Sequence, residues 1–166
     1  MKVNKQLLDL AHGPLEEAVY YNGYIVNGFR FRKNEINCKR RTQSCGVLVK
    51  GDANTSNHDY YGVLTDIIEL HYMGGNKIVM FKCEWRDVDH HGRGIVDTYG
   101  RTLVNVTRSL KSNEPFVLAC QAEQVFYVKS IKNSQWHFVI KIEPRNYYNM
   151  PSLEEENDDD EEDDDQ

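Results

Sequence analysis

The sequence predicts a mainly β protein, either a small open barrel or a strongly bent antiparallel sheet, with one short N-terminal helix. Seven or eight short apolar runs follow one another, separated by turn-forming residues, which is typical of such folds. Only one stretch, near the N-terminus, has helical character. At 166 residues and 40% hydrophobic composition, the chain can build one domain with a core. No apolar run reaches the ~20 residues of a membrane span, so we expect no membrane partner.

The charge distribution divides the chain. From Glu154 to the C-terminus there are 11 acidic residues and no basic ones. Residues 1–153 contain the other 15 of the 26 acidic residues and all 20 Lys and Arg, so they carry a net charge of about +5. We therefore expect an N-terminal stub with a short helix (1–17), a β domain (18–151) and a disordered acidic tail (152–166).

The first elements are short. Lys5–Ala11 is expected to form a helix of about two turns, which Gly13 ends. Gly46–Val49 is expected to form a strand, and residues 51–59, rich in Gly, Asp, Asn and Ser, a loop.

A basic segment lies between these elements. Tyr24–Arg32 is predicted as one strand in which Phe29 and Phe31 alternate with arginines, so one face buries rings while the other shows guanidinium groups. Six cations fall within twelve residues: Arg30, Arg32, Lys33, Lys39, Arg40 and Arg41. Clustered cations beside aromatic rings are typical of nucleic-acid contact, and the alternative is a solvated loop over a core. The last three cations also weakly match a nuclear import signal.

The clearest predicted unit is a hairpin of two long strands, Tyr60–Tyr72 and Lys77–Arg86. The turn between them contains Gly74 and Gly75, which permit positive φ. The expected core-facing residues are Leu64, Ile68, Leu70 and Tyr72 on the first strand, and Phe81, Cys83 and Trp85 on the second. We expect this hairpin to be the longest in the protein.

The remaining strands are short. They are predicted over Ile95–Tyr99, Thr102–Thr107, Phe116–Cys120, Val125–Val128 and a last run in which Trp136, Phe138 and Ile140 alternate with His137 and Lys141.

Two weaker site patterns compete with plain structural interpretations. Tyr60, Tyr61, Tyr72 and Trp85 could line an aromatic pocket for a methylated ammonium group, although an ordinary aromatic core uses the same residues. The loop with Asp87, Asp89, His90 and His91, with Cys83 upstream, carries groups that can ligate a metal. Adjacent histidines rarely reach one ion together, and Cys83 belongs to a core-facing row.

Four cysteines complete the inventory of reactive groups. Cys38 and Cys45 are separated by six residues, which fits no common zinc motif, and Cys83 and Cys120 stand apart. We expect free thiols, and the sequence leaves a pairing of Cys38 with Cys45 open.

Four sequence blocks resemble a known family. They are residues 21–31 (YNGYIVNGFRF), residues 60–70 (YYGVL through IEL), residues 81–85 (FKCEW) and residues 114–128 (EPFVLA through QVFYV). In this order they resemble a plant domain-of-unknown-function family that occurs in proteins of En/Spm-type (CACTA) DNA transposons, downstream of the catalytic region. Arg86 departs from the family pattern. The block order is also distantly similar to that of bromo-adjacent-homology domains.

The resemblance implies a nuclear, transposon-derived plant protein and supplies no chemistry of its own. We therefore expect a non-catalytic accessory domain that binds DNA, chromatin or the rest of a transposase. We expect no catalytic residues, metal, cofactor or small-molecule substrate. The alternative is a metal-dependent nuclease or transferase fragment that uses the loop from Asp87 to His91.

The split charge yields the first prediction. If the six cations of the basic segment bind phosphate, deleting residues 154–166 should strengthen non-specific DNA binding, because the acidic tail competes for them. With three cations on phosphate, the log–log salt slope should be roughly −3, measurable by fluorescence anisotropy. Replacing Lys39, Arg40 and Arg41 with Glu is the control, and unchanged binding would exclude this segment as the contact surface.

Overall fold

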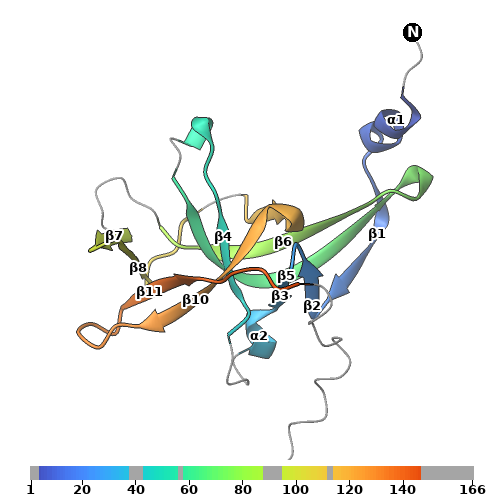
Figure 1. Cartoon of the computed structure of the whole chain (residues 1–166). Helices are drawn as coiled ribbons and strands as arrows, with labels where there is room; N and C mark the ends of the chain where they lie inside the picture. Colours follow the sequence, from blue (N-terminus) through green and yellow to red (C-terminus); the bar gives the residue numbers. More distant parts are fainter. Residues whose placement is uncertain (1–3, 38–42, 56–57, 88–94, 112–113, 147–166) are drawn as a thin grey trace, which may run out of the picture.

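The computed structural model describes residues 4–37, 43–55, 58–87, 95–111 and 114–146 (Figure 1). The helical elements are α1 (Lys5–Ala11), α2 (Asn34–Asn37), η1 (Ala53–Thr55), η2 (Met73–Gly75) and η3 (Ala119–Gln121). The strands are β1 (Pro14–Tyr21), β2 (Gly23–Val26), β3 (Phe29–Arg32), β4 (Gly46–Val49), β5 (Tyr60–Tyr72), β6 (Lys77–Trp85), β7 (Ile95–Thr98), β8 (Arg101–Asn105), β9 (Phe116–Leu118), β10 (Ala122–Lys129) and β11 (Trp136–Lys141).

One antiparallel sheet dominates the molecule. Nine strands pair in the order β7-β8-β11-β10-β4-β5-β6-β9, with β1 added beside β5, and the sheet curls into a half-barrel (Figure 1). This confirms the predicted fold class. Strands β7, β8, β10 and β11 gather at one end, and α1 lies beside the η2 turn at the tip of the β5–β6 hairpin (Figure 1). In the described part of the chain, no helix is long and apolar enough to cross a membrane.

Strand β5 is the shared element of the sheet. Its 13 residues run about 40 Å at the usual strand rise. Strand β6 follows one edge, and the other edge is divided between β4, which pairs with residues 60–63, and β1, which pairs with residues 67–72. As predicted, β5 and β6 form the longest hairpin among the described strands. Both glycines of its turn have positive φ, 75° and 79°.

A β-bulge in β5 changes which residues enter the core. The β5–β6 register shifts between Leu64 and Asp66, where the Thr65 hydroxyl donates a 2.9 Å hydrogen bond to the Lys82 carbonyl. Because the extra residue reverses the alternation, Ile67 is fully buried and Ile68 only half-buried. The prediction that Ile68, Leu70 and Tyr72 face the core together with Leu64 was therefore wrong. The row of Phe81, Cys83 and Trp85 on β6 is buried as predicted.

Two strand glycines allow the sheet to close on itself. Gly62 faces Trp85 across the β5–β6 pair, and a Cβ at Gly62 would lie 2.7 Å from the indole. The Tyr127 hydroxyl of β10 donates a 2.8 Å hydrogen bond to the Gly62 carbonyl. Gly46 of β4 lies so close to the Val125 carbonyl that no side chain fits. Around these contacts sits the core, whose largest fully buried side chains include Phe31 and Phe81 in an edge-to-face pair at 4.9 Å.

The segment predicted as one strand over Tyr24–Arg32 is a small hairpin. Asn27 and Gly28 have φ values of 51° and 79°, which define a two-residue turn between β2 and β3. Asn-Gly favours this turn because both residues tolerate positive φ. The Gly28 carbonyl accepts a hydrogen bond from Arg145, and a Cβ there would lie 2.7 Å from the Arg145 carbonyl, so the chain after β11 crosses this turn.

The structure describes the N-terminal end of the β domain. Helix α1 spans the predicted residues, and the Asn4 side chain caps it by accepting a 3.1 Å hydrogen bond from the Gln6 backbone. Strand β1 begins at Pro14, so the expected boundary between residues 17 and 18 falls inside a strand paired with β5. Residues 152–166 lie outside the described residues.

The glycine–indole contact can be tested by stability measurements. Trp85→Ala should lower the free energy of unfolding by about 3–5 kcal/mol, because it removes a core side chain. Gly62→Ala should lower it by about 1–3 kcal/mol through overpacking against the indole. Urea denaturation of both variants and of the double variant measures these changes.

The double variant is the control for direct contact. With the indole gone, the added methyl group at position 62 has room, so its cost should largely disappear. Additive costs would show that Gly62 and Trp85 act independently. An unchanged melting temperature for Trp85→Ala would place Trp85 on the surface.

Candidate nucleic-acid interface

The basic segment predicted to contact nucleic acid is only partly available to solvent. Arg32 is 7% exposed, and Lys33 lies 3.9 Å from Asp66 with its side chain 18% exposed. Arg30 is half-buried. Lys39, Arg40 and Arg41 lie outside the described residues, so their role remains a prediction.

Burial along strand β3 does not alternate, because Phe29, Phe31 and Arg32 are buried and Arg30 is half-buried. Gln124 of β10 donates hydrogen bonds to the carbonyls of Arg30 and Ser44. The β2–β3 hairpin therefore lies against the main sheet instead of projecting from it. The expectation that Arg32 presents its guanidinium group to solvent was wrong.

The aromatic pocket candidates do not form one open cluster. Tyr61 and Trp85 belong to the core, and the Tyr60 ring meets Trp85 edge-on at 6.4 Å. Tyr72 lies at the opposite end of β5, at the hairpin tip. A hollow of about 390 Å³ beside Trp85 is lined by none of the three tyrosines. Tyr61 and Trp85 are therefore ordinary members of the aromatic core.

The proposed metal loop falls largely outside the described residues. This applies to Asp89, His90 and His91, whereas the Asp87 backbone amide donates to the Arg108 carbonyl. Within the described ranges, no group of three or more His, Cys, Asp or Glu side chains could hold a metal. Burial raises the pKa of Cys83 to about 12, so this thiol stays protonated at neutral pH.

The described cysteines carry thiols. Cys45 is buried, with its Sγ 3.5 Å from the Asn34 side-chain oxygen, and Cys120 is exposed. Cys38 lies outside the described residues.

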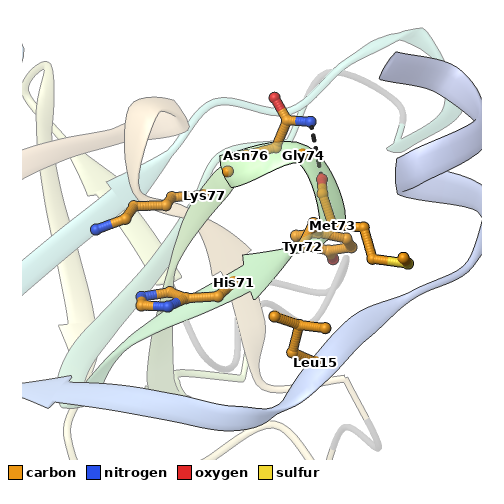
Figure 2. A pocket seen from close by; sticks show the side chains of 8 residues that line it. Leu15, His71, Tyr72, Met73, Gly74, Asn76 and Lys77 are labelled. Carbon is orange, nitrogen blue, oxygen red and sulfur yellow. Dashed lines mark hydrogen bonds between the residues drawn. The ribbon is translucent and has the colours of Figure 1, made fainter. Parts of the chain in front are cut away.

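A hollow of about 370 Å³ opens at the tip of the β5–β6 hairpin (Figure 2). Leu15 of β1 and Met73 of η2 border it with apolar side chains that are 50% and 51% exposed. His71 and Lys77 hold the pKa of Glu69 below its ordinary value through hydrogen bonds of 2.7 Å and 3.1 Å. The two basic groups are thus already paired, and this hollow offers no free catalytic pair.

A second basic region, which was not predicted from the sequence, comprises parts of β8 and β10 and the loops that follow them. We call it the basic surface and define it by five exposed cations, Arg101, Arg108, Lys111, Lys129 and Lys132. The segments 99–113 and 125–142 contain no acidic residue, and this absence was the sequence signal. Among the described residues, none of the five cations pairs with a carboxylate.

The strand pairing brings Arg101 and Lys129 to one end of the sheet, and Arg108, Lys111 and Lys132 lie in the loops that follow β8 and β10. Val104 pairs with His137, which in turn faces Lys129, and the Val106 amide donates a 2.9 Å hydrogen bond to Gln135. Two carboxylates on other strands and loops are engaged with other cations: Glu84 bonds Arg86 at 3.1 Å and Asp59 pairs with Lys141 at 3.7 Å. A polyanion meets a local excess of positive charge here.

His137 reports this electrostatic environment. Burial lowers its pKa below the ordinary value of 6.5, a backbone hydrogen bond involving Ser134 opposes the shift, and the charges of Arg86 and Lys129 lower the pKa further. Burial is the largest cause of this shift, and the two cationic charges act in the same direction.

A family model described as "Domain of unknown function (DUF4216)" matches residues 68–139, which reach from the second half of β5 to β11. The match contains the whole basic surface and excludes the basic segment around Arg30. No curated protein and no solved structure matches the chain.

The His137 environment predicts a pH dependence of stability. Because the pKa is lower in the folded state, the unfolded chain takes up the proton first as the pH falls below about 6.5. The contribution of His137 to the free energy of unfolding should therefore be constant above about pH 6.5 and should fall as the pH is lowered further. Urea denaturation across pH 5–8 should show a weaker decline for His137→Gln. His58→Gln, on an exposed loop, is the matched control, and identical profiles for all three proteins would contradict the assignment.

Proposed function

We propose that this chain is a non-catalytic accessory domain that contacts DNA through the basic surface. The observation that carries the proposal is a set of five exposed cations that pair with no carboxylate of the described residues and come from two acid-free segments that the sheet brings together. Clustered Lys and Arg neutralise backbone phosphates and release counterions, which supplies most of non-specific DNA affinity. No base-reading motif is required for this binding.

The biological setting belongs to the same proposal. We infer a plant DNA-transposon protein that acts in the nucleus, because four blocks of the sequence resemble a family of such proteins. Two of these blocks, residues 81–85 and 114–128, lie wholly inside the region matched by the domain of unknown function. Chromatin and the remainder of a transposase are the competing partners.

The test uses the full chain and a fluorescent duplex of about 20 base pairs. Lys129→Glu/Lys132→Glu should weaken binding about tenfold or more at low salt. It should also make the log–log salt slope shallower by about 1.8, because two phosphate contacts are lost. Fluorescence anisotropy over a salt series measures both effects.

A variant with the same net charge is the control. Lys5→Glu/Lys77→Glu places the same two reversals at α1 and the hairpin tip, away from the basic surface, and should bind nearly as well as the unmodified chain. Equal losses for both double variants would show that only net charge matters. If the unmodified chain fails to bind the duplex, the partner must be sought among proteins. Including Mg²⁺ in one arm tests cleavage, the outcome expected of a nuclease.

A further inference from the structure

The sheet that carries the basic surface also presents an apolar face to solvent. In the β8–β11–β10 register, Phe138 pairs with Leu103 on one side and Val128 on the other, and Ile140 pairs with Phe126. Residues paired across antiparallel strands share a face. Together with Trp136, two positions before Phe138, they form what we call the outward face: Leu103, Phe126, Val128, Trp136, Phe138 and Ile140.

The alternate residues of the same strands show which way this face points. Val104 is fully buried, Tyr127 is 8% exposed, and Val139 packs against the core cluster. Among the described residues, the core and the side chains packed on it include no member of the outward face. Val128 and Ile140 are 50% and 47% exposed. The apolar alternation of β11 was correctly predicted, but its aromatic row faces outward.

Cationic and aromatic groups meet on this face. The Arg101 guanidinium lies over the Phe138 ring, 6.0 Å from its centroid, and Arg101 belongs to the basic surface. A planar cation on a half-buried ring makes a platform on which a nucleic-acid base can also stack. A purely apolar partner would gain nothing from the surrounding charges.

A strained aromatic residue lies at the end of the same strands. Tyr99, in the turn between β7 and β8, has a φ of 54° and is 99% exposed. A bulky residue in the left-handed region costs free energy, and this turn position normally takes Asn or Gly. With its side chain fully in solvent, Tyr99 recovers none of this cost through core packing. Strain retained at an exposed residue is typical of binding sites.

We propose that the outward face binds single-stranded nucleic acid, with bases stacked on Phe138 and Tyr99 and phosphates at the basic surface. This inference rests on the proposed function and adds that the bound nucleic acid is single-stranded. In a duplex the base faces are occupied by one another, whereas a single strand offers them to exposed rings. DNA and RNA single strands share this chemistry.

The experiment compares four fluorescent probes with the full chain: a 12-nucleotide dT strand, the corresponding rU strand, and a duplex of each type. Phe138→Leu keeps an apolar side chain but removes the ring. Tyr99→Asn removes the ring and places a favourable residue in the turn. Each should bind the single strands about 5- to 150-fold more weakly, the loss expected for one stacked base. Duplex binding should change less than twofold.

Controls separate binding from folding. Ile140→Val alters the same face without removing a ring and should leave binding unchanged. Tyr99→Asn should melt at the same or a higher temperature than the unmodified chain, so its weaker binding cannot be attributed to unfolding. The dT and rU probes together identify whether DNA, RNA or both are bound.

The outcomes separate this inference from the proposed function. If Phe138→Leu and Tyr99→Asn bind single strands as tightly as the unmodified chain, the inference is wrong. If that occurs while Lys129→Glu/Lys132→Glu still weakens duplex binding, the proposed function stands alone. If no probe binds the unmodified chain at low salt, both are overturned.

Discussion

The contact between Gly62, Trp85 and Tyr127 holds the two halves of this protein together. The indole of β6 lies against a glycine of β5, and the same glycine carbonyl accepts the hydroxyl hydrogen of a tyrosine from β10. Strands that are far apart in the sequence are thereby fixed across the core. Any side chain at position 62 would push them apart. The curvature of the half-barrel, and with it the position of the β8–β11–β10 end, depends on this close approach.

The division of β5 between partners creates two ends with different chemistry. At one end, β1, α1 and the hairpin tip expose apolar side chains such as Leu15 and Met73. At the other end, β4 pairs with β10, and the sheet continues through β11 and β8; residues 99–113 and 125–142 in this region contain no acidic residue. The basic surface and the outward face lie at the same end of the sheet and meet at Arg101, whose guanidinium lies over Phe138. A ligand with negative charges and flat apolar groups matches this combination.

Much of the fold could be predicted from local patterns. Helix α1, strand β4 and strand β5 have the predicted bounds, because caps, glycines and alternation act over a few residues. The bulge at Thr65 could not be predicted, since it depends on a hydrogen bond to Lys82 across the hairpin. The Asn27-Gly28 turn could have been predicted, because the dipeptide is itself a turn signal.

The sequence by itself determined the mainly β class, the long hairpin, the burial of Trp85 and the separation of charge along the chain. Only the tertiary structure decided which charges and rings reach solvent. Arg32 follows a perfect alternation yet is buried, in a strand that contacts β10. Phe138 follows the same kind of alternation yet faces outward. Alternation distinguishes two faces of a strand, but only the neighbouring layers determine which face is covered.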